Sequence, residues 1–382
     1  MTTFLLYDDT LRSHELRHEI GESIADPIGF IEHEGNRIVL ASSQEETILS
    51  KREDVIDEVW DQHELGYKDL VQNKSFPIEL VEAEIVLRAL EKLGVGSVVV
   101  PPTFQVIVAD HLREGGVEVV VDADAWVERR RRKSPWELEG IERAQRATET
   151  AMLTAARMLR EAEPSVSPPQ TLRFEGELLT AELIREAMVA ELLSQGAESE
   201  DILIHSGDAC LEGHDPGTGP IIPDSTCIID CFPRDRRSGC FTDMTRTFVV
   251  GEISDEIRGL HGHCHAAMRI ALDAMRPGAA DPFVNVTEYF HSQGFPTQLH
   301  HDDPGPLSEG FSHGLGHGVG LEVHERPWMG RRADALQTGD VVAVEPGLYF
   351  RGLGGVRLED TVVITENGPE HFTDPYPYDL EP

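Results

Sequence analysis

Three histidines and four carboxylates carry the chemistry that this sequence suggests. His313, His317 and His324 stand in a glycine-rich apolar stretch, residues 313–324. The four carboxylates lie in apolar, strand-like segments elsewhere in the chain: Asp230, Asp243, Glu345 and Glu359. Carboxylate oxygens combined with one imidazole suit manganese, cobalt, iron or zinc, and such a site requires no cysteine. The sequence therefore predicts a centre that holds a pair of divalent cations.

Two predicted β-hairpins position the carboxylates. The first joins residues 226–233 to 240–250, and the second joins residues 339–350 to 355–365. Each hairpin carries one carboxylate per strand, at a spacing typical of paired strands whose opposing residues face one another. Four carboxylates that converge on one cleft repel one another strongly, and bound cations remove that repulsion. Surface positions are disfavoured, because isoleucine and valine surround these carboxylates in the sequence.

The overall composition predicts an acidic globular protein of two domains. The chain has 382 residues, of which 40% are hydrophobic, and its 69 acidic and 33 basic residues give a formal net charge of −36. Such a surface repels nucleic acid and anionic lipid. It suits a halophilic source, since the Debye length shortens to about 3 Å in 1 M salt.

The cysteines and the N-terminal residues bear on the cellular compartment. Five cysteines without a CxxC pair predict reduced, buried thiols. The first residues show no basic segment followed by an apolar one, and no apolar stretch approaches the roughly 18 residues of a membrane span. We therefore expect a cytoplasmic protein that binds neither membranes nor nucleic acid.

Residues 1–130 are expected to form an α/β unit. A strand-turn-strand pattern occupies residues 28–42, and residues 78–93 have helical periodicity. The strands predicted at 97–100 and 117–121 flank a further helix. Alternating strands and helices at this spacing predict a doubly wound parallel sheet. The scattered histidines of this half suggest no chemistry.

A basic cluster, Arg129–Lys133, marks the expected domain junction and is predicted to pair with acidic neighbours. Ser134 and Glu137 form a capping-box pattern at the start of a helix predicted over residues 135–163. A second long helix is predicted over residues 176–195.

At this point the chain resembles the pita-bread metallopeptidases, the family of Xaa-Pro aminopeptidase, prolidase, methionine aminopeptidase and creatinase. The matching segments lie in the expected order along the chain: the junction at 129–137, Asp230, residues 243–248, 313–325, 344–349 and 355–360. The resemblance implies a creatinase-like α/β N-terminal domain over residues 1–130. It implies an α+β pita-bread catalytic domain over residues 131–382.

The resemblance also implies roles for individual residues. Two divalent metal ions per chain, manganese in first place and cobalt or zinc as alternatives, would have five ligands: Asp230, Asp243, His317, Glu345 and Glu359. Asp243 and Glu359 would bridge the ions. The catalytic set would comprise His214, His313, His324, Glu345 and Arg357. One departure is visible, because the family commonly has Asp-x-Gly where this chain has Asp230-Cys231-Phe232.

The activity implied is that of a metal-dependent exopeptidase, an Xaa-Pro aminopeptidase or an Xaa-Pro dipeptidase. Its substrate would be a peptide with proline at the second position, and the family expectation is a homodimer. A metal-activated hydroxide would be the nucleophile, with Glu345 as general base and His313 or His324 as donor to the oxyanion. A methionine-aminopeptidase-like enzyme and a non-catalytic peptide-binding protein remain alternatives. Two weaker metal or cleft candidates are the pairs His261 with His265 and His300 with His301.

Overall fold

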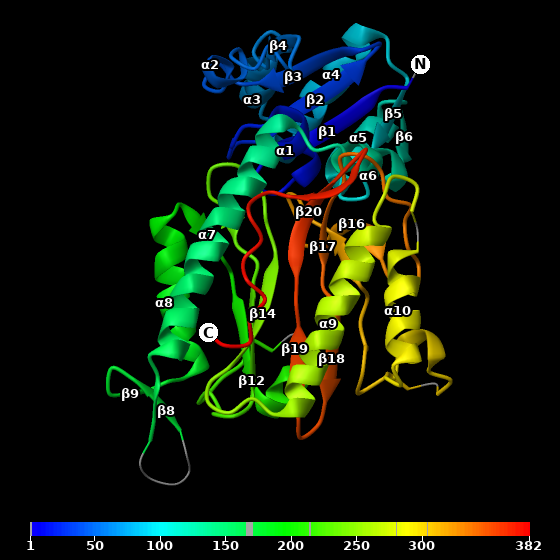
Figure 1. The fold of residues 1–382 in the computed structure, drawn as a ribbon. Helices are drawn as coiled ribbons and strands as arrows, with labels where there is room; N and C mark the ends of the chain where they lie inside the picture. The colour runs from blue at the N-terminus through cyan, green and yellow to red at the C-terminus, as the bar shows by residue number, and fades with distance from the viewer. Residues whose placement is uncertain (1, 166–170, 214, 280, 304) are drawn as a thin grey trace. The chain divides into compact units, whose positions relative to one another are not determined.

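The protein is seen here as a computed structural model, which describes residues 2–165, 171–213, 215–279, 281–303 and 305–382. It divides into two compact units, Met1–Arg132 and Lys133–Pro382 (Figure 1). Across the described residues, no helix combines the length and apolarity that a bilayer crossing demands. The five cysteines are all buried thiols, as expected.

The first unit is built on a six-stranded mixed sheet in the order β4-β3-β2-β1-β5-β6. Its strands are β1 (Phe4–Asp8), β2 (Ile28–His33), β3 (Asn36–Ala41), β4 (Glu58–Asp61), β5 (Ser97–Val100) and β6 (Glu118–Val121). Strands β1, β5 and β6 run parallel, as predicted. Strands β1, β2 and β3 are antiparallel neighbours, so the expectation of an entirely parallel sheet was wrong. The two-residue turn Glu34–Gly35, with φ of 54° and 82°, makes β2 and β3 a tight hairpin.

Helices complete the first unit around apolar sheet residues. They are α1 (His14–Ile20), α2 (Glu46–Leu49), α3 (Tyr67–Gln72), η1 (Ile78–Leu80), α4 (Val81–Leu93), α5 (Val106–Glu114) and α6 (Ala123–Arg131). The helix predicted over 78–93 is therefore present, with a 3₁₀ turn at its start. Apolar side chains of α4 such as Ile85, Val86 and Leu90 are buried in the core beneath the sheet.

The basic cluster pairs with acidic side chains, as the sequence predicted. Arg129 donates to Glu19 with an Nη2–Oε2 distance of 2.9 Å and to Glu32 at 2.6 Å. In the second unit, the Lys133 ammonium lies 2.6 Å from Glu325 Oε1, and both side chains are buried. These contacts balance the charges of Arg129 and Lys133.

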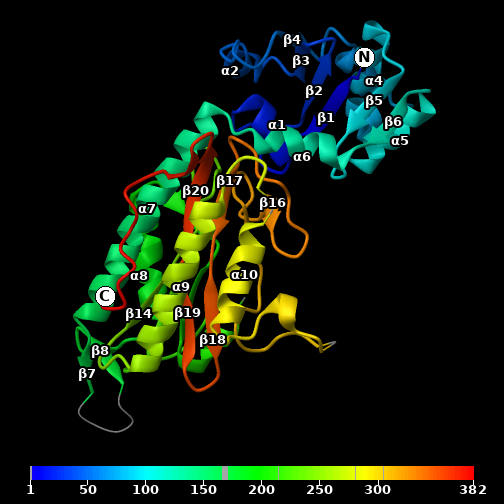
Figure 2. The ribbon, with the colours of Figure 1, turned by 45° about the vertical axis from the view of Figure 1, so that its right-hand side comes forward.

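The helices of the second unit flank its sheets (Figure 2). They are α7 (Pro135–Arg160), α8 (Ala181–Ser194), α9 (Asp255–Ala274) and α10 (Pro282–Ser292), with 3₁₀ turns η2 (Gly207–Leu211) and η3 (Gln298–His300). The predicted capping box starts α7, where Ser134 Oγ accepts from Glu137 N and the Glu137 carboxylate accepts from Ser134 N. Helix α8 begins after its cap Thr180 rather than at residue 176. The turn at Glu175–Gly176 has positive φ and joins two short strands instead.

Three sheets of the second unit carry the candidate site residues. One has the order β11-β12-β14, one has the order β16-β15-β17-β20-β21, and β18 pairs with β19. These strands are β11 (Ile202–Ser206), β12 (Thr226–Cys231), β14 (Met244–Val249), β15 (Gly316–Gly318), β16 (Glu325–Met329), β17 (Val341–Val344), β18 (Gly347–Phe350), β19 (Gly354–Arg357), β20 (Asp360–Thr365) and β21 (Gly368–His371). The remaining short strands are β7 (Glu163–Pro164), β8 (Leu172–Phe174), β9 (Glu177–Leu178), β10 (Ala197–Glu198) and β13 (Arg234–Asp235).

Both predicted hairpins are present, with one change of register. Strand β12 pairs antiparallel with β14, but Asp230 lies opposite Thr245 rather than opposite Asp243. Side chains alternate along a strand, so Asp243 still shares a face with Thr245. In the second hairpin the pairs Val344–Asp360 and Gly347–Arg357 belong to one register. That register, carried across the break between the pairs, sets Glu345 opposite Glu359.

Candidate metal centre

A buried ion pair holds the first carboxylate. Asp230 on β12 accepts a hydrogen bond from Arg357 Nη2 at 2.6 Å through its Oδ2 atom. Arg357, at the end of β19, also donates to the Tyr349 hydroxyl at 3.2 Å and from Nε to Thr245 Oγ1 at 3.2 Å. The guanidinium thereby fixes the direction of the carboxylate, whose Oδ1 atom is left for another ligand.

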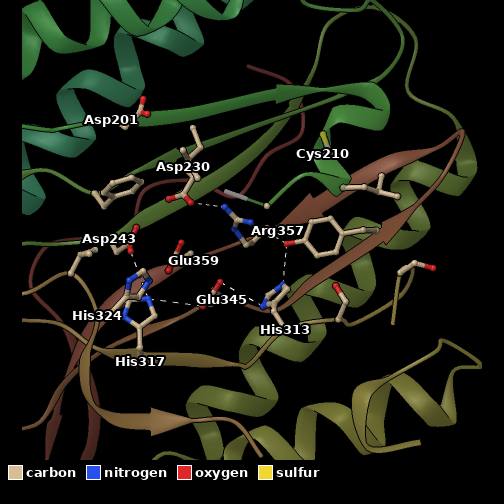
Figure 3. A pocket seen from close by; sticks show the side chains of 18 residues that line it. Asp201, Cys210, Asp230, Asp243, His313, His317, His324, Glu345, Arg357 and Glu359 are labelled. Carbon is tan, nitrogen blue, oxygen red and sulfur yellow. Dashed lines mark hydrogen bonds and ion pairs between the residues drawn. The ribbon is translucent and has the colours of Figure 1, made fainter. Parts of the chain in front are cut away.

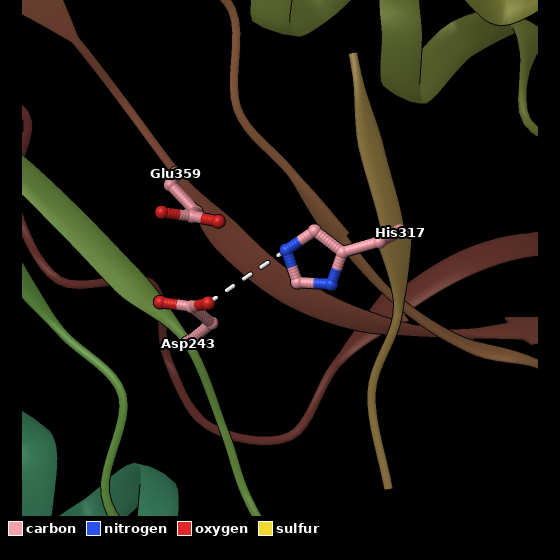
Figure 4. A group of neighbouring side chains, drawn as sticks. All are labelled: Asp243, His317 and Glu359. Carbon is pink, nitrogen blue, oxygen red and sulfur yellow. Dashed lines mark ion pairs between the residues drawn. The ribbon is translucent and has the colours of Figure 1, made fainter. Parts of the chain in front are cut away.

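Asp243, His317 and Glu359 form a compact group whose ligand atoms all lie within 4.8 Å of one another (Figure 4). The distance from His317 Nε2 to Asp243 Oδ2 is 3.8 Å. His317 Nδ1 lies 3.1 Å from the carbonyl oxygen of Gly318, which can only accept, so Nδ1 carries the proton. The Nε2 lone pair therefore points toward the carboxylates, as a metal ligand requires.

Glu345 lies between two of the histidines. Its Oε1 atom is 4.0 Å from His317 Nε2, and its Oε2 atom is 3.7 Å from His313 Nδ1. Pro346 follows it, and both Glu345 and Glu359 stand at the break between the two strand pairs of their hairpin. At this break the backbone belongs to neither strand pair. Both carboxylates therefore lie next to each other.

Burial and mutual repulsion shift the pKa values of the carboxylates in this group. Burial, then the neighbouring carboxylates, raises the pKa of Asp243 and of Glu359 well above the ordinary values. Burial also raises the pKa of Glu345 to about 7. Burial, followed by the nearby His324, lowers the pKa of His317 to about 4, so its imidazole is neutral at pH 7. Without a counter-charge these carboxylates cannot all ionise.

The donor set fits divalent cations. The Oδ1 atoms of Asp230 and Asp243 are buried and have no hydrogen-bond partner among the described residues. A buried carboxylate oxygen without a donor is costly unless it binds an ion. The neutral imidazole of His317 and the oxygens of Glu345 and Glu359 complete a mixed N/O set suited to first-row divalent metals.

The group borders a cavity of about 440 Å³ (Figure 3). All residues that line it belong to the second unit: Asp201, Leu203, Cys210, Leu211, Gly213, Asp230, Phe232, Asp243, Ser308, Ser312, His313, His317, Val323, His324, Glu345, Tyr349, Arg357 and Glu359. The volume lies within the range of small-ligand sites, about 300–1,000 Å³.

The structure brings most predicted site residues to this cavity. His324 lies beside His317 with a ring-centroid distance of 4.2 Å. His313 borders the same cavity. Since His214 falls outside the described residues, its predicted role is untested.

The weaker histidine candidates have other surroundings. His261 Nε2 lies 2.6 Å from the Tyr378 carbonyl, and the ring of His265 contacts the Tyr378 ring. His300 stacks on His291 beside a separate hollow, and His301 lines that hollow too.

A family model described as metallopeptidase family M24 matches residues 139–366, more than half of the chain. The chain belongs to metallopeptidase family M24. Members of this family use divalent metal ions, which agrees with the donor set of the cavity. The family expected from the motifs is therefore confirmed.

Individual relatives of this M24 chain are named as peptidases and dipeptidases. An Xaa-Pro dipeptidase of Pyrococcus furiosus is 37% identical over 135 residues, which cover 35% of each chain. The peptidase YqhT of Bacillus subtilis is 32% identical over 185 residues, 47% of this chain and 49% of the relative. The M24 chain thus spans about half the length, or less, of the curated relatives it matches.

Solved structures show the fold over the whole M24 chain. An X-Pro aminopeptidase from Thermotoga maritima has a TM-score of 0.77 at 21% identity, and the match covers 99% of this chain and 97% of that one. A prolidase from Pyrococcus furiosus has a TM-score of 0.71 at 21% identity, with 99% and 97% covered. These likenesses confirm the expected two-part pita-bread fold.

Several contacts of the M24 site were not foreseen from the sequence. The hydroxyl of Tyr349 lies 3.0 Å from His313 Nε2, so it links that histidine to Arg357. Thr245 Oγ1 donates to Glu359 Oε2 at 2.6 Å. Both residues stand inside matched motifs, and Thr245 lies two positions from Asp243, so alternation along the strand was the signal available.

Proposed function

We propose that this M24 protein is a metal-dependent exopeptidase that hydrolyses the bond between an N-terminal residue and proline. Two divalent cations, manganese in the native protein, would share five ligands: Asp230, Asp243, His317, Glu345 and Glu359. The observation that supports this proposal most directly is a pair of buried oxygens, one each from Asp230 and Asp243, beside a neutral imidazole. Neither oxygen has a hydrogen-bond partner in the part of the chain that the structure describes. An ordinary buried acid cluster would instead satisfy these oxygens with donors.

The ions, when bound, activate a water molecule at neutral pH and polarise the scissile carbonyl group. Glu345 is the proposed general base, because its partly exposed carboxylate lines the cavity and can take a proton there. The same carboxylate then passes the proton to the departing proline nitrogen. His324 donates to the carbonyl oxygen as negative charge develops there.

The opposite side of the cavity holds the rest of the peptide. Arg357, Tyr349 and His313 form a chain of hydrogen bonds along this side, at 3.2 and 3.0 Å. These groups present donors and fixed positive charge to the carbonyl or carboxylate that follows the cleaved bond. Since Arg357 also holds Asp230, it couples substrate binding to the orientation of a proposed ligand.

Preference for proline follows from the chemistry of the bond. The nitrogen of an Xaa-Pro bond has no N–H to donate, so recognition relies on shape and on polarisation of the carbonyl. Relatives named as Xaa-Pro dipeptidases support the same substrate class. We further propose a creatinase-like domain over residues 1–130, a catalytic domain over 131–382, and a cytoplasmic homodimer from a salt-rich source.

Release of free alanine from Ala-Pro and Ala-Pro-Ala in high salt tests the proposal. The protein is stripped of metal, assayed, and assayed again after addition of Mn²⁺. Metal-dependent cleavage of the tripeptide indicates an aminopeptidase, whereas cleavage of the dipeptide alone indicates a dipeptidase. Failure to cleave either while Mn²⁺ is bound contradicts the proposed function and favours a peptide-binding role. Release of methionine from Met-Ala-Ser, without Xaa-Pro cleavage, favours the methionine-aminopeptidase alternative.

A matched pair of variants separates the metal site from general effects. Asp243→Asn removes one carboxylate charge from the centre and is expected to abolish both Mn²⁺ binding and hydrolysis. Asp273→Asn changes an exposed carboxylate on α9 and should leave both unchanged. Full activity of Asp243→Asn would contradict the dinuclear site.

A further inference from the structure

The departure from the family motif after Asp230 lies in the wall of the cavity. Strand β12 pairs with β11 such that Leu203 lies opposite Asp230. The same register, carried two residues further, sets Asp201 opposite Phe232. Leu203, Asp201 and Phe232 all line the cavity, which confirms that this end of the hairpin faces it.

The neighbouring strand brings Phe232 beside the metal centre. Cys231 pairs with Met244 between β12 and β14, and Thr242 N donates to Pro233 O at 3.1 Å. Both contacts belong to a register in which Phe232 lies opposite Asp243. The side chain of Phe232 is therefore adjacent to one of the proposed ligands and exposed to the cavity.

The backbone holds Phe232 in this direction. Proline disfavours the helical conformation in the residue before it, so Pro233 keeps Phe232 extended. Cys231 just before it is paired on both sides, to Ile202 and to Met244, and Pro233 O accepts from Thr242 N just after it, so the backbone around Phe232 is held on either flank. Because side chains alternate along an extended chain, the Phe232 side chain leaves the backbone on the same face as Asp230, toward the cavity.

The two ends of the cavity differ in chemistry. Phe232, Leu203 and Val323 give one end an apolar wall beside the buried oxygens of Asp230 and Asp243. Arg357 reaches Asp230 at 2.6 Å, and on its other side lie the polar groups of Tyr349 and His313, with Leu211 and Cys210 nearby.

A peptide has a positive ammonium at its start and carbonyl or carboxylate oxygens further on. The positive guanidinium of Arg357 attracts the carbonyl or carboxylate oxygens to the side that Tyr349 and His313 share, so the first residue faces Phe232 and Leu203. The side chain of that residue then meets the apolar wall.

We propose that Phe232 limits the size of the first substrate residue, so that the protein selects peptides that begin with glycine, alanine or serine before proline. This inference rests on the proposed function. In the family that the chain resembles, glycine commonly stands at this position, and glycine leaves the space open. The benzyl group of Phe232 occupies that space and meets side chains longer than that of serine. Phe232 thus determines specificity for the first substrate residue by its volume, although it neither binds metal nor transfers a proton.

The ratio of kcat/KM for Leu-Pro to that for Ala-Pro measures this limit. The wild type is expected to favour Ala-Pro, and Phe232→Ala should raise the ratio at least tenfold, since one methylene in a pocket changes discrimination by about 10–200-fold. Phe232→Val, which disturbs the strand less, should raise it by a smaller factor. Leu193→Ala, at an exposed position of α8 that does not line the cavity, should leave the ratio within twofold of the wild type.

Other outcomes overturn the proposal or distinguish it from the function on which it rests. A ratio that is unchanged or lower in both Phe232 variants, with melting temperatures near that of the wild type, refutes the size limit. If the wild type cleaves no Xaa-Pro peptide, the proposed function is refuted instead. In that case, thermal shifts of the Mn²⁺-loaded protein with L-alanine and L-leucine test the size limit separately. Phe232→Ala must then gain binding of leucine relative to alanine, or the size limit is refuted as well.

Discussion

Replacement of Arg246 by methionine tests how the back of the metal centre is held together. Arg246 is in β14, its side chain is 1% exposed, and it forms an ion pair of 2.8 Å with Asp360, which is 4% exposed. Its five N–H groups all have acceptors: Asp360 Oδ1 and the carbonyl oxygens of Thr245, Glu359, Tyr376 and Pro377. One side chain thus joins β14, the strand start beside Glu359 and the segment 371–382.

The expected loss of stability follows from these contacts. Methionine fills similar space but donates nothing, so the carboxylate of Asp360 stays buried without its cation. Removal of one partner of a buried ion pair costs about 3–5 kcal/mol. His371 and Tyr378 still contact the Asp360 carboxylate in the variant. The loss of unfolding free energy should therefore not exceed this range. Loss of the bond to the Glu359 carbonyl should also weaken Mn²⁺ binding.

The loss depends on pH with a definite sign. Burial raises the pKa of Asp360, but the Arg246 guanidinium and His371 outweigh burial and hold it below the ordinary value of 3.8. A carboxylate with a depressed pKa stabilises the fold above the unfolded pKa, and this contribution is lost as the pH falls. The difference between the wild type and Arg246→Met is therefore greatest at neutral pH and shrinks below about pH 4.

Urea unfolding of the metal-free proteins, followed by circular dichroism, measures the effect. Arg258→Met is the matched control, because Arg258 also contacts the C-terminal segment, at Glu381, but both side chains are more than half exposed. It should change the free energy of unfolding by less than about 0.5 kcal/mol. The double variant Arg246→Met/Asp360→Asn should lose less than the sum of the single losses, since the two groups interact directly. A loss below about 1 kcal/mol for Arg246→Met would refute the reasoning.

Further predictions concern protons, salt and thiols. In the metal-free protein Glu345 holds its proton to about pH 7, whereas the unfolded chain releases it near 4.5, so stability should fall as the pH rises between these values. Glu345→Gln should flatten this slope in urea titrations. For the same reason the affinity for Mn²⁺ should rise with pH up to about 7, as calorimetry can show; a pH-independent affinity would contradict proton competition at Glu345. The net charge of −36 predicts a melting temperature that rises from low salt to 1 M KCl more than it does for a chain of balanced charge. Burial raises the pKa of the Cys227 and Cys264 thiols, so a disulfide reagent at pH 7 should label them only after unfolding; rapid labelling of both in the native protein would exclude the packing described here.

The sequence alone was sufficient where local chemistry determines structure. The start of α7 was predictable because Ser134 and Glu137 make the same reciprocal hydrogen bonds wherever this pattern caps a helix, and Pro135 stands at the first helical position, where no N–H is needed. The convergence of carboxylates was predictable because charge in apolar strands requires a partner. The start of α8 was misplaced by five residues, since the turn at Glu175–Gly176 belongs to a hairpin that periodicity does not reveal.

Long-range pairing set the limit of sequence reasoning. The register that places Asp230 opposite Thr245 depends on β13 and the connection between the strands, which spacing along the chain does not show. The position of the β2–β3 hairpin in the first sheet, between β1 and β4, likewise depends on long-range pairing that local sequence does not determine. The position of Phe232 in the cavity wall became visible only with both neighbouring strands in place.

The hydrogen bonds that frame the centre also have a consequence for the order of folding. Arg357 and Asp230 are separated by 127 residues, and Thr245 and Glu359 by 114. Contacts between such distant positions close long loops of the chain. The entropic cost of loop closure must be met before these contacts stabilise the fold. The cavity should therefore assemble after the hairpins that supply its walls. The rate of Mn²⁺ binding during refolding would then report when the last long-range contacts form. Fragments that end between the two hairpins should bind no Mn²⁺.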